Sequence, residues 1–381
     1  MLRVLHCIYD DPANPWVGGG GAVRVRELYR RLTHEVEATV LTGNYPRARA
    51  EMIDGIRYRR LGAQRPYAWS RWTYSRAATR LLTHAAYDAA IFDFSTYTPI
   101  RVPRRRPVGI TVHHITGATA ATRWGRWLGS GIARLERAML RRAGCLSATS
   151  GATLAQLEEI LAPGTCLVQV GAGVPDELFC VQRRERNYLL YFGRLDWFQK
   201  GLDTLLDAAA LIVREHPELE LRIAGRGKDA DRVRERIRSL GLDRNVRLFS
   251  AVTDAQRLEL FAGAIVVLMP SRFEGFGMVA AEAMAAGAPV VAASAGSLPE
   301  VVAPPAGGRL VPAGDAAALA EAVTRLLDAP EEREEISRSA RASAERFRWD
   351  EVARRHLDFL HCIAQQTGSR TEFGAGKKGV G

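Results

Sequence analysis

Short runs of consecutive apolar residues alternate with longer amphipathic stretches along most of the chain. A continuous apolar run is typical of a strand that is buried on both faces of a parallel sheet, and an amphipathic stretch is typical of a helix that covers such a sheet. The alternation predicts βαβ units and therefore doubly wound parallel sheets of the α/β class. In the first half, the pattern predicts strands at residues 3–8, 38–41, 89–92, 108–112 and 145–149 and helices at residues 22–32, 69–84 and 131–142.

The same alternation begins again after a connecting segment at residues 171–179. Two such runs in tandem predict two Rossmann-like domains, and we place them at residues 1–175 and 176–345, facing each other across a cleft. An amphipathic segment predicts a further helix within residues 346–366, and the polar, glycine-rich tail at 367–381 is expected to be disordered. The second half is predicted to hold strands at residues 188–192, 220–224, 246–248, 264–269, 290–291 and 310–311 and helices at residues 202–213, 230–240, 255–262, 278–286 and 316–327.

Charge is distributed unevenly between the two halves. Residues 1–175 hold 24 Lys and Arg against 12 Asp and Glu, whereas the remainder holds 29 against 30. A basic half joined to a neutral half indicates an anionic partner for the first half, such as a membrane surface, a phosphorylated acceptor or nucleic acid. The N-terminus has no signal-peptide pattern, and no apolar run reaches the roughly 18 residues that cross a bilayer. We therefore expect a cytoplasmic protein.

Five cysteines are scattered along the chain without a CxxC pair, at positions Cys7, Cys145, Cys166, Cys180 and Cys362. An odd, scattered set of this kind is typical of reduced thiols in the core of a cytosolic protein.

Two carboxylates, Glu274 and Glu282, stand eight positions apart around a glycine-rich turn. The turn follows the predicted strand at 264–269 and opens into a predicted helix, so it lies at the carboxyl edge of a parallel sheet, where open α/β sheets bind ligands. Gly275 and Gly277 allow the backbone to approach a ligand closely, and the free N–H groups of the helix start point at it. Because two carboxylates accept hydrogen bonds from neutral hydroxyls, the turn favours a polyol over a phosphate.

The loop after the predicted strand at 188–192 carries two cations, Arg194 and Lys200, with a glycine beside each. Arg offers a planar fork and Lys a point charge, and together they suit a diphosphate whose charge grows as a bond breaks. A solvated loop with incidental cations would explain this segment in isolation. Together with the carboxylate turn, the diphosphate interpretation is favoured.

Other motifs have two interpretations each. Four glycines at residues 18–21 precede a predicted helix rich in arginine, and they indicate either an anion site or a flexible connector. Gly225 and Gly227 belong to a G-x-G-x-x-A segment that matches a dinucleotide-binding fingerprint. The match is weak, because the fingerprint normally lies in the first βα unit of its domain and this segment lies in the second. Asp229 and Asp231 in the same segment form a DxD pattern, for which acids at a helix start are favoured over a metal-bound diphosphate.

His113 and His114 end the predicted strand at 108–112, again at the carboxyl edge of a sheet. A lone histidine is more often a satisfied polar residue than a catalyst, and the position at the ligand-binding edge makes both interpretations tenable. Tryptophans interleave with arginines around residues 69–76 and 123–137. This chemistry suits either a lipid interface or core packing with solvated arginines.

Taken together, these motifs resemble the retaining GT-B glycosyltransferases of family 4 over most of the chain. The resemblance rests on Gly20-Gly21 with Arg24, on His113, on the segments GRLDWFQKGL, AGRG, MPSRFEGFGMVAAEAMAAGAPVVA and GSLPEV, and on a closing FRWDEVA. It implies a GT-B fold whose C-terminal crossover helix packs back on the N-terminal domain. It also implies a metal-independent reaction that uses a nucleotide diphosphate sugar as donor substrate and needs no cofactor.

The same resemblance implies roles for individual residues. Arg194 and Lys200 would hold the donor diphosphate, Glu282 the nucleotide ribose, and Glu274 the hydroxyls of the transferred sugar. Phe276, Gly275 and Gly277 would contribute backbone contacts, and Gly225 and Gly227 would lie on the nucleotide side. His113 would lie near the donor sugar, and Gly20 and Gly21 near the donor phosphate or the acceptor.

We therefore expect a hexosyltransferase that retains anomeric configuration and acts on an acceptor hydroxyl. The basic, tryptophan-bearing first half favours a lipid-linked acceptor of envelope or exopolysaccharide synthesis, reached by peripheral binding to the anionic inner face of the plasma membrane. The alternatives are a soluble small-molecule acceptor, a GT-B sugar-nucleotide epimerase and a nicotinamide-dependent oxidoreductase. A nucleic-acid partner is not expected, because the chain has no recognisable binding module. The sequence does not distinguish UDP, GDP and ADP as the donor nucleotide.

Overall fold

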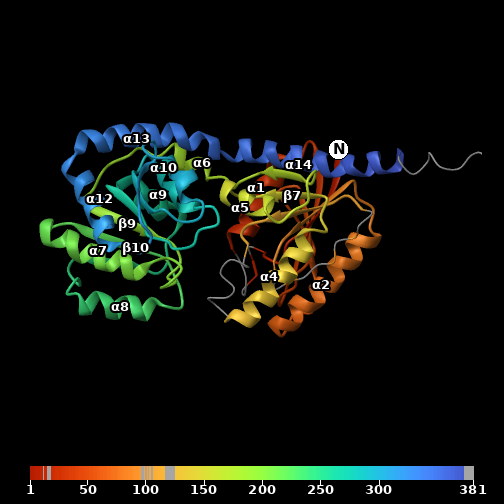
Figure 1. Cartoon of the computed structure of the whole chain (residues 1–381), viewed down its shortest axis with the longest axis horizontal. Coiled ribbons are helices and arrows are strands. Elements are labelled where there is room, and N and C mark those ends of the chain that lie inside the picture. The colour runs from red at the N-terminus through yellow and green to blue at the C-terminus, as the bar shows by residue number, and fades with distance from the viewer. Residues whose placement is uncertain are drawn as a thin grey trace, which may run out of the picture. The chain divides into compact units, whose positions relative to one another are not determined.

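The computed structural model divides into two compact units (Figure 1). The first unit combines Met1–Ala172 with the segment that begins at Trp349, and the second is Gly173–Arg348. The structure describes residues 1–11, 13–14, 19–95, 98, 101, 103, 106–115 and 125–372, apart from the side chains of 126 and 366–372.

The first unit is built on an eight-stranded sheet in the order β3-β4-β2-β1-β5-β6-β7-β8. All neighbouring strands are parallel except the edge pair β3 and β4, which is antiparallel. Strands β5, β6 and β7 are buried along their whole length, as expected for central strands covered by helices on both faces. The strands are β1 (Leu2–Cys7), β2 (Val36–Gly43), β3 (Glu51–Ile53), β4 (Ile56–Leu61), β5 (Ala89–Asp93), β6 (Val108–Val112), β7 (Cys145–Ala148) and β8 (Cys166–Gln169).

Helices cover both faces of this sheet. Apolar residues of α1 (Gly20–Arg31) and α14 (Trp349–Glu372) form one core with the sheet, and those of α2 (Tyr67–His84) and α4 (Arg126–Leu140) contribute to the other. A short helix, α5 (Gly151–Glu158), follows β7 and begins at a Ser150 cap, whose side chain accepts from Thr153 N. The C-terminal helix α14 thus packs against the N-terminal helix α1 in the same unit.

The second unit is built on a six-stranded parallel sheet in the order β11-β10-β9-β12-β13-β14. Its two cores lie on opposite faces of the sheet, one with α9, α10 and α13 and the other with α7, α8 and α12. The strands are β9 (Tyr188–Phe192), β10 (Glu220–Ala224), β11 (Val246–Phe249), β12 (Val266–Met269), β13 (Val290–Ala293) and β14 (Gly308–Val311). The helices are α6 (Asp176–Phe179), α7 (Leu202–Glu215), α8 (Ala230–Ser239), α9 (Asp254–Gly263), α10 (Met278–Ala285), α11 (Leu298–Val302), α12 (Ala316–Asp328) and α13 (Pro330–Ala344), with a 3₁₀ turn at Glu345–Phe347.

The predicted fold class, two Rossmann-like parallel-sheet domains with a C-terminal helix on the first, is confirmed. The pattern did not predict β3, β4, α5, β8, α6, α11 and α13. Helix α14 continues to Glu372, so residues 367–372 are helical and do not belong to a disordered tail, whereas 373–381 lie outside the described residues. Within the part of the chain that the structure describes, no helix is long and apolar enough to cross a membrane.

Candidate functional site

The carboxyl edge of the second sheet gathers most of the residues that the sequence singled out. Strands β10, β9, β12 and β13 are neighbours in the sheet, and each ends in a loop at this edge. Arg194 and Lys200 follow β9, Gly225 follows β10, and Glu274 follows β12. The order of parallel strands therefore brings these loops together although they are far apart in the sequence.

Lys200 and Glu274 form an ion pair at this edge. The Nζ atom of Lys200 lies 2.6 Å from Oε2 of Glu274, and the two side chains are only 14% and 15% exposed. The loops that carry them are also joined through the backbone, because the N–H of Arg272 donates to the carbonyl oxygen of Gln199 at 3.0 Å. Arg194 stays on the same loop, where it donates to Oε1 of Gln199 at 3.3 Å. A cation expected on a phosphate and a carboxylate expected on a sugar thus contact each other directly.

The glycine-rich turn leads from Glu274 into α10 through a left-handed residue. Gly277 caps the helix with φ of 87°, a conformation that side chains of L residues rarely adopt. The carbonyl oxygen of Glu274 accepts from the N–H of Ser297 at 3.3 Å, which joins the turn to the loop after β13. Phe276 packs edge-on against Phe347, with ring centroids 5.7 Å apart. Gly275 lies within the same turn and is partly buried.

Glu282 is buried within α10 and pairs with Arg257 of α9. Burial raises the pKa of the Glu282 carboxyl, and the Arg257 guanidinium opposes this shift. The Arg257 guanidinium also lies over the Phe192 ring at the end of β9, with 5.9 Å to the ring centroid. Arg257 was not predicted from the sequence, because nothing in its helix marks it as the partner of a carboxylate on another helix.

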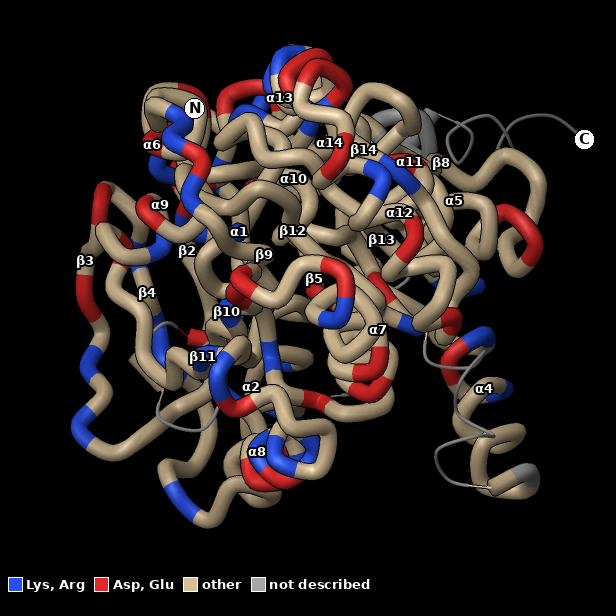
Figure 2. Tube along the Cα trace, turned by 90° about the vertical axis from the view of Figure 1, so that its left-hand side faces the viewer, with Lys and Arg blue, Asp and Glu red and all other residues tan. Residues whose placement is uncertain are grey.

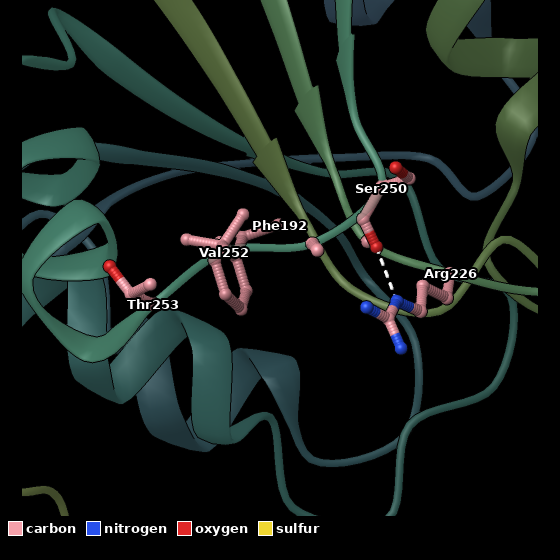
Figure 3. Close-up of a pocket in the computed structure, with 7 residues that line it drawn as sticks. Phe192, Arg226, Ser250, Val252 and Thr253 are labelled. Atoms are coloured by element: carbon pink, nitrogen blue, oxygen red, sulfur yellow. Dashed lines mark hydrogen bonds between the residues drawn. The ribbon is translucent and has the colours of Figure 1, made fainter.

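A pocket of about 420 Å³ opens at the same edge (Figure 3). Its volume lies within the range typical of small-molecule sites. The Arg226 side chain closes one side by donating from Nε to the carbonyl oxygen of Ser250. The lining residues are Phe192, Gly225, Arg226, Ser250, Ala251, Val252 and Thr253. Phe192 thus lines the pocket and also contacts Arg257, which joins the pocket to the buried Glu282.

Gly225 and Gly227 have a structural reason to be glycine. A Cβ atom at Gly225 would stand 1.8 Å from the carbonyl oxygen of Gly193, and one at Gly227 would stand 2.1 Å from that of Leu195. The absence of side chains therefore lets the loop after β10 pack directly on the loop that carries Arg194. Asp229 of the DxD pattern accepts from the N–H of Trp197 at 2.8 Å. This hydrogen bond joins the loop after β10, which holds Asp229, to the loop after β9.

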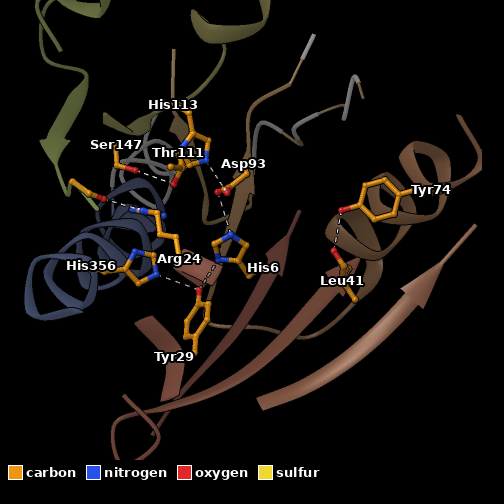
Figure 4. Close-up of polar contacts among 11 residues, drawn as sticks. His6, Arg24, Tyr29, Leu41, Tyr74, Asp93, Thr111, His113, Ser147 and His356 are labelled. Carbon is orange, nitrogen blue, oxygen red and sulfur yellow. Dashed lines mark hydrogen bonds and ion pairs between the residues drawn. The ribbon is translucent and has the colours of Figure 1, made fainter. Parts of the chain in front are cut away.

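In the first unit, His113 belongs to a buried polar network (Figure 4). Its Nε2 atom lies 2.9 Å from Oδ2 of Asp93, and Nε2 of His6 lies 3.1 Å from Oδ1 of the same carboxylate. Burial alone would raise the pKa of the Asp93 carboxyl, but His113 and His6 together hold it well below its ordinary value. Tyr29 bonds the other ring nitrogen of His6 at 2.8 Å. Asp93 therefore orients His113, which remains partly exposed.

Gly20 and Gly21 form the first turn of α1, which follows β1 at the carboxyl edge of the first sheet, while Gly18 lies outside the described residues. A side chain at Gly21 would contact Ile8 and the Asp10 carboxylate. Arg24, one turn further on, is buried, and its Nε donates to the carbonyl oxygen of Gly171 at 2.9 Å. Neither terminal nitrogen of Arg24 has a hydrogen-bond partner among the residues that the structure describes. His113, Gly20 and Gly21 thus share one sheet edge in the first unit.

The sequence singled out the loops that carry Arg194, Lys200 and Glu274, but it did not reveal three features of these sites. Asp93 is a single acid at a strand end, and its partners are His6 on β1 and His113 in the loop after β6. The pocket residues 250–253 follow a short strand without any motif. Arg257 is one of many arginines in a basic chain. In each case the signal is a tertiary contact, which a single sequence does not contain.

Comparisons with known proteins agree with this architecture. Residues 180–343 match the family described as Glycosyl transferases group 1, and residues 19–173 match the one described as Glycosyl transferase 4-like domain. An MMP alpha-(1->4)-mannosyltransferase of Mycolicibacterium hassiacum is 34% identical over 262 residues, which cover 65% of this chain and 63% of that protein. The match therefore spans about three fifths of that relative's length.

Two solved structures extend the comparison to the whole chain. Sucrose-phosphate synthase from Thermosynechococcus elongatus has a TM-score of 0.75 at 22% identity and covers 98% of this chain and 100% of that one. HepE of Anabaena in complex with UDP-glucose has a TM-score of 0.72 at 18% identity, with coverages of 97% and 100%. At these identities the likeness establishes the fold.

Proposed function

The chain belongs to the group 1 glycosyltransferase family, and from this premise we propose that it transfers a hexose from a nucleotide diphosphate sugar to an acceptor hydroxyl with retained anomeric configuration. The observation that carries the proposal is the Lys200–Glu274 ion pair, which lies at the same edge of the sheet as the 420 Å³ pocket. A cation and a carboxylate held together there suit a ligand that has a diphosphate next to a sugar.

The donor fits this edge in three parts. The nucleobase would occupy the pocket lined by Phe192 and Gly225, and the ribose hydroxyls would bond to Glu282. The diphosphate would bind Arg194 and Lys200. The hydroxyl groups of the transferred sugar would then donate hydrogen bonds to Glu274 and accept hydrogen bonds from the backbone N–H groups of the turn at Phe276 and Gly277. The complex of HepE with UDP-glucose supports a donor of this class.

Cleavage of the donor leaves a growing negative charge on the β-phosphate. Preorganised cations stabilise such a charge more in the transition state than in the ground state, and that difference accelerates the reaction. Lys200 is preorganised because the Glu274 carboxylate holds its ammonium group in place before the donor arrives. Within the first unit, His113, oriented by Asp93, would accept a hydrogen bond from a ligand hydroxyl or donate one to it.

A hydrolysis screen across UDP-, GDP- and ADP-sugars tests the activity, because water can replace the acceptor. We expect one nucleotide series to be cleaved, and we expect Lys200→Ala to lower the rate by about 10²-fold, as for the loss of one oriented oxyanion donor. Arg238→Ala removes an exposed cation from α8 and serves as the control. If Lys200→Ala turns over at the rate of the control, the assignment of leaving-group stabilisation is wrong. Epimerised sugar nucleotide as the product would instead reveal the epimerase alternative.

We further infer that the acceptor is presented at an anionic membrane surface. Helix α4 exposes Trp127 and Leu128, which are 95% and 67% exposed, together with Leu135 at 59%. Exposed arginines, Arg134 among them, lie on the same helix (Figure 2). Helix α2 adds a stacked pair of half-exposed tryptophans, Trp69 and Trp72. These exposures oppose the core-packing interpretation, because apolar side chains next to cations suit a lipid interface. Trp124 lies outside the described residues.

Sedimentation with vesicles that contain an anionic phospholipid tests this inference. The double variant Trp127→Ala/Leu128→Ala should release most of the bound protein into the supernatant, because it removes the apolar surface that would enter the interface. Leu211→Ala, which truncates an exposed leucine on α7 of the second unit, is the matched control. Wild-type protein that stays wholly in the supernatant would favour a soluble acceptor.

A further inference from the structure

Three of the five cysteines converge in the first unit, although they are far apart in the sequence. Cys145 begins β7, Cys166 begins β8, and Cys362 lies on α14. The three sulfur atoms all lie within 4.8 Å of one another, and those of Cys166 and Cys362 are 2.7 Å apart. Although separated in the sequence, these three free cysteines lie in or against the core, whereas Cys180 of the second unit is exposed and does not fit the expectation of a core thiol.

The sheet register and one glycine build this cluster. Cys145 and Cys166 are register partners in parallel strands, so their side chains leave the sheet on the same face. Gly109 of β6 is the register partner of Cys145 on its other side. A Cβ atom at Gly109 would stand 2.5 Å from Cδ1 of Ile363, so α14 approaches the sheet closely because this position lacks a side chain. That approach carries the neighbouring Cys362 onto the two strand cysteines.

The cluster is separate from the proposed catalytic residues of its unit. Cys145 and Cys166 stand at the starts of β7 and β8, whereas His113 follows the end of β6. In a parallel sheet the starts and the ends of the strands lie at opposite edges. The thiols therefore do not belong to the edge that carries His113, Gly20 and Gly21.

Cysteine can fill a core as a small apolar residue, and packing alone would account for Cys145, which is fully buried. Cys166 and Cys362 are only partly buried, so solvent reaches the cluster from their side. Filling a helix-sheet contact does not require three sulfur atoms directed at one point. Convergence of thiols with a solvent-accessible side is what a soft metal ion requires.

We propose that Cys145, Cys166 and Cys362 together bind one soft metal ion, and that Cu(I) is the ion that suits them. Thiolate ligands select soft ions such as Cu(I) and Zn(II). Structural zinc almost always takes four protein ligands, and no fourth His, Cys, Asp or Glu of the described residues joins this group. Cu(I) accepts three thiolates in a plane. Each thiol releases its proton to solvent as its metal–sulfur bond forms, and no oxidant or reductant is consumed.

The geometry requires a small adjustment. With metal–sulfur bonds of about 2.3 Å, three sulfurs around a central ion stand about 4 Å apart. The pair Cys166 and Cys362 therefore opens by about 1 Å, which rotation of the partly exposed Cys362 side chain about its Cα–Cβ bond can supply. The bound ion would tie β7 and β8 to α14. It would stabilise the first unit without taking part in sugar transfer.

The test titrates reduced protein with Cu(I) under anaerobic conditions in competition with the chromogenic chelator bicinchoninate. We expect one Cu(I) per chain, and a rise in the melting temperature of the loaded protein. Cys166→Ser and Cys362→Ser, each checked for folding by circular dichroism, should weaken binding by about tenfold or more. Cys180→Ser, which removes an exposed thiol outside the cluster, is the control and should bind Cu(I) like the wild type.

A second measurement needs no variant. Cu(I) should protect the partly exposed Cys166 and Cys362 of the wild-type protein from alkylation, as read by mass spectrometry, while Cys180 stays reactive. The proposal is overturned if the reduced protein does not compete with bicinchoninate. It is also overturned if Cys166→Ser binds like the wild type, or if Cys180→Ser is the variant that loses the ion. A Cys166–Cys362 disulfide that forms in air, together with no metal uptake after reduction, would assign the pair to redox chemistry.

Discussion

Replacement of Asp93 by Asn should destabilise the first unit far more than the loss of an ordinary surface acid. The buried Asp93 carboxylate bonds His113 at 2.9 Å and His6 at 3.1 Å, one histidine on each oxygen. Hydrogen bonds to a charged group contribute about 1.5–3 kcal/mol each. Asparagine keeps one oxygen but turns an amide N–H₂ toward the other histidine. The expected loss is about 3–5 kcal/mol, the range for a buried pair that loses one partner.

Urea unfolding of Asp93→Asn and Asp88→Asn provides the comparison. Asp88 precedes the same strand and pairs with Arg3 at 2.8 Å, but at the surface, where solvent screens the pair. The same chemical change should therefore cost much less at Asp88. If the two variants lower the free energy of unfolding equally, the buried network does not stabilise the fold. In the transfer assay, Asp93→Asn should also lower kcat, because His113 loses the partner that orients it.

The pH dependence of stability follows from the lowered pKa of Asp93. Because the folded pKa lies below that of the unfolded chain, the carboxylate contributes fully above the unfolded pKa. The contribution is lost as the pH falls toward the folded pKa. In acid, the stability gap between wild type and Asp93→Asn should therefore narrow, and a gap that widens as the pH falls would contradict this sign.

Two further predictions concern the second unit. Arg257→Ala leaves the buried Glu282 without its partner and should lower the free energy of unfolding by about 3–5 kcal/mol. The double variant Arg257→Met/Glu282→Leu should recover this stability in urea unfolding, but it should not recover donor binding. Val252→Trp places a large side chain in the 420 Å³ pocket and should weaken binding of the free nucleoside diphosphate, as measured by calorimetry. The control Met52→Trp, at an exposed position of β3, should leave this binding unchanged. Equal affinities of the two variants would assign the nucleoside to another site.

The sequence predicted the strands that are buried on both faces, whereas the strands that it missed, β3, β4 and β8, lie at or next to an edge of the first sheet. Strands β5, β6 and β12 carry uninterrupted apolar runs because helices cover both of their faces. The edge strands β3 and β8 are partly exposed, so their residues need not be apolar and leave no clear pattern. Helix α13 was missed for a related reason: it buries only a few small residues along one side, and the rest of its sequence is polar.

The site followed the same division. Glycine-rich turns and loop cations are local features, so the segments that hold Arg194, Lys200 and Glu274 could be predicted from spacing alone. Contacts between segments that are far apart in the sequence could not be predicted in this way. Examples are the contact of Glu282 with Arg257 and that of His113 with Asp93. The three converging cysteines are the extreme case, because each one by itself is an ordinary small core residue.

The ion pair between Lys200 and Glu274 changes how the two loops that carry them should be understood. The loop composition assigned the cation to a phosphate and the family resemblance assigned the carboxylate to a sugar, as if the two residues worked independently. Their contact at 2.6 Å means that each fixes the position of the other before a donor binds. A ligand that bonds to both must therefore present a phosphate oxygen and a sugar hydroxyl close together, and the anomeric carbon of a nucleotide sugar is where those two groups meet. We therefore propose that the selectivity for a glycosyl diphosphate resides in this pair.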